Sequence, residues 1–307
     1  MASPDWLALY LLEDLGPAGR SDLAAGDITS KPLFPVGQRG RARLVARERA
    51  FLSGTSHAIE VFRRLKVKAT SSMNDGRWVE AGAEVLLLEG PTRGILAGER
   101  TALNLVARMS GIATATRELA EALERAGCKG KVAGTRKTTP GFRAFEKEAI
   151  VTGGGDPHRM GLFDEAMVKD NHREAFLGAG PKGKIPSGAG PKGRTAAAGV
   201  SVADLVRKVK AANPAKVLTC EVESLEDALA AAGAGADWLL IDNQAPKTAK
   251  AWADKVWKTH PKTKVEVSGG IRPDNVVAYG WAHRISMGWL TQRAPAKDFS
   301  LEWVGNL

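Results

Sequence analysis

Cationic side chains gather around one tight turn in the sequence. Residues 134–147 read GTRKTTPGFRAFEK, which supplies Arg136, Lys137, Arg143 and Lys147 with a single glutamate to balance them. Arginine binds a carboxylate through two parallel hydrogen bonds, whereas lysine presents a compact charge to phosphate or carboxylate oxygens. Gathering such cations in a pocket is costly unless a polyanion neutralises them. The segment therefore predicts a site for a small ligand with several negative charges.

A second group of cations follows along the chain. Residues 158–172 read HRMGLFDEAMVKDNH and add His158, Arg159 and Lys169, and Arg100 precedes them on a predicted helix. With the two cations of the TRK element, the candidate pocket holds five fixed cations. Three other basic residues are expected to pair locally with Glu or Asp: Arg143, Lys147 and Arg173.

Two carboxylates could complement these cations. Glu221 and Asp242 each end a predicted strand and stand 21 residues apart, the length of one strand–helix–strand repeat. Neighbouring strands would therefore present them side by side. Mg²⁺ binds through few carboxylates together with substrate phosphates and water, so the pair could hold this ion. The pair could also accept hydrogen bonds from ribose hydroxyls, and the alternative is that it only balances the lysines.

A glycine-rich turn follows a later predicted strand. Residues 268–275 read SGGIRPDN and place Ser268, Gly269 and Gly270 between a strand and a helix. Backbone N–H groups in such a turn can bind a phosphate. An ordinary tight turn is the alternative.

Short apolar runs that alternate with helical patterns must position these residues. The predicted strands are 131–135, 165–170, 216–222, 238–243, 264–269 and 284–288. The predicted helices are 141–151, 201–212, 224–233, 246–259 and 273–280. Such alternation indicates an open doubly wound sheet or an α/β barrel. In a barrel, the polar residues at the carboxyl ends of the strands would share one mouth, where substrate sites are built.

The first part of the chain, up to about residue 95, has a different pattern of predicted helices and strands. Its predicted elements are helices at 5–15 and 56–65 and strands at 41–54 and 84–90. These predict a mixed α/β domain. A long helical pattern follows at 97–127, and its interruption at Ser110–Gly111 predicts a break or a junction between domains.

Composition narrows the class of protein. The 307 residues are 44% hydrophobic and 25% charged, with a net charge of +10 and only two cysteines. No apolar stretch of about 18 residues indicates a membrane span. The cysteine count excludes a disulfide framework, and we expect a cytoplasmic protein. A tandem GAGPKG repeat within 178–193 is predicted to be a flexible basic insertion.

Several motifs, in collinear order, resemble one enzyme family. They are ERTALN (99–104), GTRKTTPG (134–141), HRMGL (158–162), VKDNH (168–172), EVES (221–224), LLIDN (239–243) and EVSGGI (266–271), with LLEDLG…GDITS (11–30) as an N-terminal signature. This set is similar to the nicotinate-nucleotide pyrophosphorylase (carboxylating), or quinolinate phosphoribosyltransferase, family. The combination of GTRKTTPG with VKDNH is highly specific.

The resemblance implies a fold, an assembly and a reaction. The fold is an N-terminal α/β sandwich domain (1–110, completed by about 290–307) plus an incomplete α/β barrel (111–289). The assembly is a homodimer or larger, with the sandwich domain of one subunit over the barrel mouth of the other. The reaction converts quinolinate and phosphoribosyl pyrophosphate, with Mg²⁺, to nicotinate mononucleotide, CO₂ and pyrophosphate in NAD synthesis.

The resemblance also assigns site residues. The quinolinate carboxylates would meet Arg136, His158, Arg159 and Lys169, with Arg100 entering from a second subunit. The residues that would act in catalysis are Lys137, Lys169, Glu221 and Asp242, of which Glu221 and Asp242 would hold the metal and the ribose. Further substrate contacts would come from Thr135, Ser268, Gly269, Gly270, Met287, Gly288 and Trp289, mostly at the 5′-phosphate.

Some features depart from the family pattern. WLTQR (289–293) stands where the family commonly has ALTHS, which puts the 5′-phosphate end in question. Within the same fold, a molybdenum-transport class shares a TRKT element, and a nicotinate-using phosphoribosyltransferase is a further enzyme alternative. From another class, a basic nucleic-acid-binding module remains, although no basic patch interleaved with aromatics accompanies the charge.

Overall fold

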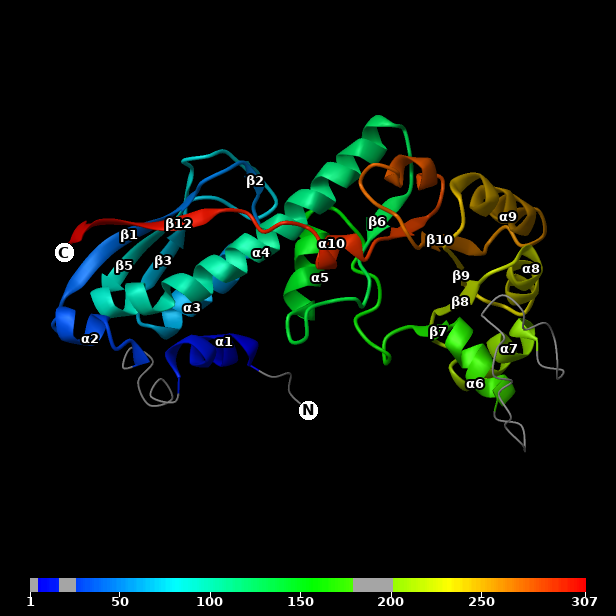
Figure 1. The fold of residues 1–307 in the computed structure, drawn as a ribbon, viewed down its shortest axis with the longest axis horizontal. Coiled ribbons are helices and arrows are strands. Elements are labelled where there is room, and N and C mark those ends of the chain that lie inside the picture. The colour runs from blue at the N-terminus through cyan, green and yellow to red at the C-terminus, as the bar shows by residue number, and fades with distance from the viewer. Residues whose placement is uncertain (1–4, 17–25, 179–200) are drawn as a thin grey trace, which may run out of the picture. The chain divides into compact units, whose positions relative to one another are not determined.

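The computed structural model describes residues 5–16, 26–178 and 201–307. The chain divides into two compact units (Figure 1). The first unit holds residues 1–120, 137–157 and 288–307, and the second holds residues 121–136 and 158–287. The predicted insertion at 178–193 lies outside the described residues, apart from Gly178 at the end of a helix.

The first unit is built on an antiparallel sheet with the strand order β12-β1-β5-β3. Its strands are β1 (Arg39–Ala46), β3 (Lys68–Ser71), β5 (Glu84–Pro91) and β12 (Phe299–Asn306), and a separate small sheet pairs β2 (Ala50–Phe51) with β4 (Trp78–Val79). Exposed arginines alternate along β1 with the buried Gly40, Ala42 and Leu44, as the two-residue period of a strand requires. The predicted single strand at 41–54 is wrong, because β1 ends at Ala46 and β2 pairs elsewhere.

Among its described residues, the first unit contains six α-helices. They are α1 (Trp6–Leu15), α2 (Ser30–Leu33), α3 (Thr55–Arg64), α4 (Thr92–Arg125, up to residue 120), α5 (Arg143–Thr152) and α10 (Trp289–Gln292). The helices α1 and α3 pack together, and α3 also packs against β3. The apolar side chains that these helices cover include Phe62, Leu86 and Leu88, which are fully buried.

The predicted break at Ser110–Gly111 is wrong, because α4 continues through both residues. A Cβ atom at Gly111 would lie 2.1 Å from the carbonyl oxygen of Pro295. Glycine at this position therefore allows a close approach of the C-terminal segment to the helix. Ser110 accepts a hydrogen bond from the main chain of Ser53 at 3.0 Å and does not interrupt the helix either.

The second unit contains a six-stranded parallel sheet with the order β6-β11-β10-β9-β8-β7. The strands are β6 (Lys131–Ala133), β7 (Ala166–Val168), β8 (Leu218–Val222), β9 (Trp238–Asp242), β10 (Lys264–Ser268) and β11 (Arg284–Ser286). The helices are α6 (Asp170–Gly178), α7 (Val202–Ala212), α8 (Leu225–Gly233) and α9 (Pro246–Thr259). Among the described residues β6 and β7 do not pair, so the sheet is an open barrel and confirms the predicted fold class.

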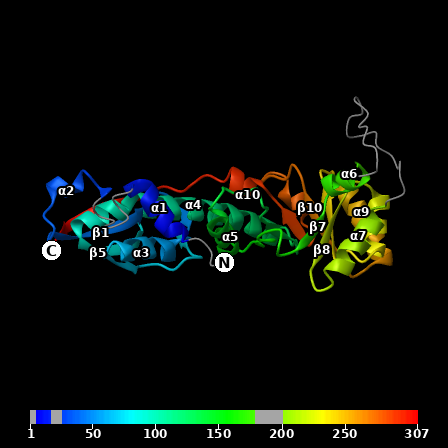
Figure 2. The same cartoon turned by 90° about the horizontal axis from the view of Figure 1, so that it is seen from below.

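Helices α7, α8 and α9 lie along one face of the parallel sheet (Figures 1 and 2). That face presents buried apolar side chains, including Leu239, Ile241, Val265 and Val267. Cys220 lies on the same face, and burial, followed by the charges of nearby carboxylates, raises the pKa of its thiol to about 12. The predicted helix at 273–280 is only a 3₁₀ turn (Val276–Tyr279), because the glycine-rich loop extends to Asn275. No described helix has the length and hydrophobicity to cross a bilayer.

Candidate active site

Strand register places four of the predicted site residues of the second unit on the other face of the sheet. Glu221 pairs with Leu240, and Ser268 pairs with Asp242. Side chains alternate along a strand, so Asp242 points to the same face as Leu240, and hence as Glu221 and Ser268. Val168 pairs with Cys220, which puts Lys169 level with Glu221. The four polar residues therefore gather at the carboxyl edge, on the face opposite the helices.

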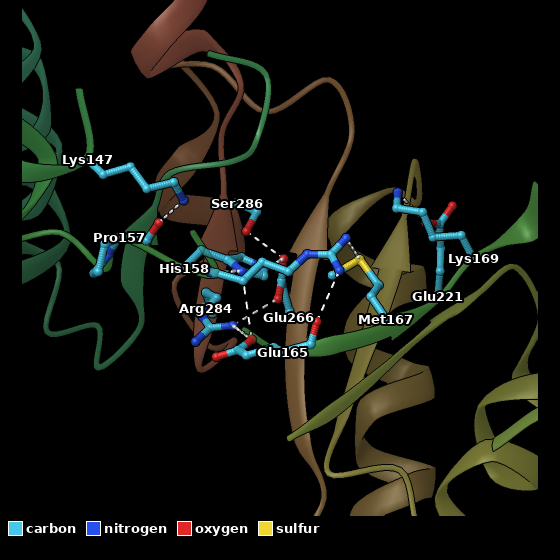
Figure 3. A network of polar contacts seen from close by, with 11 residues as sticks. Lys147, Pro157, His158, Glu165, Met167, Lys169, Glu221, Glu266, Arg284 and Ser286 are labelled. Carbon is cyan, nitrogen blue, oxygen red and sulfur yellow. Dashed lines mark hydrogen bonds and ion pairs between the residues drawn. The ribbon is translucent and has the colours of Figure 1, made fainter. Parts of the chain in front are cut away.

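Lys169 and Glu221 form an ion pair across β7 and β8 (Figure 3). The Nζ atom of Lys169 lies 3.0 Å from Oε2 of Glu221, and the carboxylate side chain is only 8% exposed. Burial raises the pKa of Glu221 above its ordinary value, although the bond from Lys169 opposes the shift. The pair presents one cation and one partly desolvated anion at the mouth of the sheet.

Asp242 lies beside this pair on β9 and is partly exposed. Its carboxylate accepts a hydrogen bond from the side-chain amide of Asn243, a residue held at a positive φ of 52°. The described residues contain no cluster of three or more His, Cys, Asp or Glu side chains that could hold a metal ion. Glu221 and Asp242 are thus two oxygen donors without the full ligand cage of a permanent metal site.

The turn after β10 approaches Asn243 closely. Gly269 and Gly270 have φ values of 90° and 62°, in the left-handed region that favours glycine. A Cβ atom on Gly269 would lie 2.2 Å from the side-chain oxygen of Asn243. Glycine is therefore required at position 269 and favoured at position 270, and the turn leaves exposed main chain next to Ser268 at the carboxyl edge.

Arg159 is a buried cation whose terminal nitrogens bond to uncharged groups. Its NH1 donates to the carbonyl oxygen of Glu165 at 3.3 Å, and its NH2 contacts the sulfur of Met167 at 3.2 Å. The residue is 7% exposed. Burial lowers the pKa of Arg159, and the positive charge of Arg136 lowers it further. Three nearby carboxylates, Glu266 among them, oppose this lowering of the pKa. A desolvated guanidinium beside a second cation can receive a further anion.

A buried carboxylate missed by the sequence analysis lies near enough to Arg159 for its charge to act on the guanidinium. Glu266, on β10, is 1% exposed and contacts His158, Arg284 and Ser286 (Figure 3). Glu266 pairs in register with Arg284 on β11, on the same face as Leu240. The signal in the sequence was a charged residue in the middle of one short strand, Glu266, and another at the start of the next strand, Arg284, in a parallel sheet whose strands are normally apolar.

The predicted site residues divide between the two units. Those in the second unit are Thr135, Arg136, His158, Arg159, Lys169, Glu221, Asp242, Ser268, Gly269, Gly270 and Met287, and those in the first unit are Arg100, Lys137, Gly288 and Trp289. Arg100 is exposed on α4 and lines a cavity of about 630 Å³ with Asn104 and Arg108. Lys137 is exposed, and its carbonyl oxygen accepts a bond of 2.6 Å from the hydroxyl of Thr291.

The basic residues expected to pair locally have varied partners. Arg173 forms an ion pair with Asp227 at 2.9 Å, which confirms the expectation for this residue. Arg143 donates to the hydroxyl of Thr138 at 3.0 Å. Lys147 is 2% exposed and donates to the carbonyl oxygen of Pro157.

Comparison with known proteins identifies the family of the chain. The family described as "Quinolinate phosphoribosyl transferase, C-terminal domain" matches residues 112–180 and 192–302. Its N-terminal domain counterpart matches residues 27–110. The chain therefore belongs to the quinolinate phosphoribosyl transferase family.

Individual relatives span most of the chain. The nicotinate-nucleotide pyrophosphorylase (carboxylating) of Homo sapiens is 40% identical over 268 residues, which cover 85% of this chain and 82% of the human protein. The "probable nicotinate-nucleotide pyrophosphorylase [carboxylating]" of Methanothermobacter thermautotrophicus is 38% identical, covering 93% of this chain and 96% of its own length. The solved structure of the nicotinate-nucleotide pyrophosphorylase from Francisella tularensis superposes with a TM-score of 0.79 at 32% identity, covering 99% of this chain and 98% of that one.

Proposed function

We propose how the residues of this chain perform the reaction of its family. The protein transfers the phosphoribosyl group of phosphoribosyl pyrophosphate to quinolinate with loss of CO₂, giving nicotinate mononucleotide and pyrophosphate. The observation that best supports our assignment of residues is the gathering of Lys169, Glu221 and Asp242 at the carboxyl edge of the sheet, with the Arg159 guanidinium beside Met167 of β7. The cations that would bind the two carboxylates of quinolinate thus lie near the carboxylates that would bind the ribose.

The quinolinate end is assigned to the cations around Arg159. Its desolvated guanidinium can bind one carboxylate through two hydrogen bonds, and Lys169 can bind the other. Arg136, whose charge acts on Arg159, belongs to the same end. We assign His158 a supporting place beside Arg159, and Arg100 the role of closing the site from a second subunit of a homodimer. A monocarboxylate would leave part of this charge unbalanced.

The phosphoribosyl end is assigned to Glu221, Asp242 and the turn at Ser268–Gly270. The two carboxylates suit Mg²⁺, because this ion is held by few protein oxygens together with substrate phosphates and water. When bound there, Mg²⁺ would neutralise charge on the pyrophosphate group. The backbone amides of the glycine turn can bind the 5′-phosphate, and Thr135, Met287, Gly288 and Trp289 are assigned to the same end.

The chemistry requires orientation and charge stabilisation more than proton transfer. The pyridine nitrogen of quinolinate forms a bond to C1 of the ribose while the bond from C1 to the pyrophosphate oxygen breaks. Lys137 is assigned to the negative charge that develops on the departing pyrophosphate. The ring nitrogen is then positively charged, so the C2 carboxylate leaves as CO₂ and its electron pair stays beside that nitrogen. A proton then completes the product at C2.

Carboxyl-labelled substrate tests this assignment. Purified protein with phosphoribosyl pyrophosphate, Mg²⁺ and quinolinate labelled in its C2 carboxyl group should release labelled CO₂ and form nicotinate mononucleotide in equal amounts. Nicotinate as the acceptor should give a kcat/KM at least about tenfold lower, because one charge-assisted contact is lost. Equal or faster turnover with nicotinate would refute the assignment of quinolinate as the substrate.

A further inference from the structure

Glu266 is the centre of a buried polar cluster on the inner face of the parallel sheet. Its Oε1 atom lies 3.0 Å from Nε2 of His158 and accepts a hydrogen bond of 2.6 Å from the hydroxyl of Ser286. Its Oε2 atom lies 3.4 Å from NH1 of Arg284. Burial favours the neutral acid, but the contacts with His158, Ser286 and Arg284 outweigh it and lower the pKa of Glu266. A buried carboxylate with this many donors is fixed in position.

The two ring nitrogens of His158 are both engaged within the protein. The main-chain N–H of Arg159 donates to Nδ1 at 2.6 Å, so Nδ1 has no proton and Nε2 has one. Nε2 therefore donates to Glu266. The backbone of His158 has a φ of 55°, in the left-handed region, which is uncommon for residues other than glycine and is stabilised here by side-chain contacts. The bond to Glu266 is one of these contacts.

We infer that Glu266 is a positioning residue, which acts through His158 to fix the Arg159 guanidinium for a substrate carboxylate. This inference rests on the proposed function, because it takes Arg159 as a quinolinate ligand. It gives His158 a role through the main chain of Arg159, in place of direct contact with the substrate. Ser286 and Arg284 hold the carboxylate from the neighbouring strand β11, and Arg284 also lies over the ring of Trp238, 4.2 Å from its centroid.

Loss of the Glu266 charge is expected to affect the two substrates differently. Loss of the Glu266 charge should release His158 and then Arg159, which weakens the quinolinate end alone. Glu221, Asp242 and the glycine turn form no hydrogen bond or ion pair with Glu266 among the described side chains, so the phosphoribosyl end should be little affected. A residue that merely stabilised the fold would alter both substrates, or only the melting temperature.

A double-mutant cycle tests the inference. The variants are Glu266→Gln, Arg159→Lys and the two combined, each measured for KM of quinolinate, KM of phosphoribosyl pyrophosphate and thermal unfolding. Glu266→Gln should raise KM for quinolinate about tenfold to a hundredfold, as loss of a charge-assisted contact does, and change the other KM less than about threefold. The double variant should match Arg159→Lys within about threefold, because coupled residues are not additive. Glu226→Gln, which removes an exposed charge on α8, is the matched control.

A second variant keeps the test decisive if Glu266→Gln does not fold. Ser286→Ala removes one hydrogen bond to Glu266 and leaves every charge in place, and it should raise KM for quinolinate about two- to tenfold. Unchanged KM values, equal effects on both substrates, or effects of the two sites that multiply would overturn the inference. Failure of wild-type protein to release CO₂ from quinolinate would instead refute the proposed function.

Discussion

Replacing Arg159 by lysine should weaken the use of quinolinate specifically. The substitution keeps the positive charge but removes the planar guanidinium, which alone can form two parallel hydrogen bonds with a carboxylate. The position is 7% exposed, so water cannot readily replace the lost contact. The terminal nitrogens of Arg159 now contact the carbonyl oxygen of Glu165 and the sulfur of Met167. Both partners are uncharged, so loss of these contacts should cost little stability.

The size of the effect follows from the lost contact. A hydrogen bond to a charged group contributes about 1.5–3 kcal/mol, so loss of one arm of the guanidinium should lower kcat/KM for quinolinate about 10- to 150-fold. Arg173→Lys is the matched control, because the ion pair of Arg173 with Asp227 is partly exposed. Exposed pairs contribute about 0.2–1 kcal/mol, so this variant should change kcat/KM less than about fivefold.

The assay is initial-rate release of CO₂ at varied quinolinate and saturating phosphoribosyl pyrophosphate, repeated with the two substrates exchanged. We expect a large change in kcat/KM for quinolinate and a small change in kcat/KM for phosphoribosyl pyrophosphate. An Arg159→Lys variant with wild-type kcat/KM for quinolinate would refute the assignment of this guanidinium to a substrate carboxylate. A lower kcat/KM for phosphoribosyl pyrophosphate alone would also refute it.

Three further predictions concern the other assigned residues. Lys137→Ala should lower kcat at least about 100-fold without lowering the melting temperature, because Lys137 is exposed and assigned to the leaving group; a wild-type rate would contradict that role. Mixing Arg100→Ala with Lys169→Ala subunits should restore roughly a quarter of wild-type activity if a dimer shares its sites, and verified mixed dimers without activity would exclude sharing. Glu221 has a raised pKa in the folded protein, so stability should fall as pH rises from 4.5 through the raised value. When the free energy of unfolding is measured in urea across that pH range, Glu221→Gln should flatten its decline with pH. An unchanged slope would mean that other groups cause the decline.

The parallel sheet could be predicted because its signal is local and repeated. Each short apolar run of the second unit became a strand, with predicted ends within a few residues of the observed ones. Polar residues that follow such runs must lie at one edge of a parallel sheet, which is why Lys169, Glu221 and Asp242 could be grouped from the sequence. The residues of the candidate site that end strands were therefore accessible to sequence reasoning.

The interior of the site was not accessible in the same way. Glu266 alternates with valines in β10, a pattern that also describes a strand with one face in water. Only the pairing of six strands shows that the second face is also enclosed and that Arg284 lies opposite. The predicted helix break at Gly111 was wrong for a similar reason. The contact that requires glycine there comes from Pro295, which is far away in the chain.

A crystal structure of the protein with quinolinate bound would show which side chains receive the two carboxylates. We expect one carboxylate within hydrogen-bonding distance of the Arg159 guanidinium and the other near Nζ of Lys169, with the ring nitrogen directed toward Glu221 and Asp242. Quinolinate bound away from this edge of the sheet, or bound there with Arg159 still directed to Glu165 and Met167, would contradict this expectation.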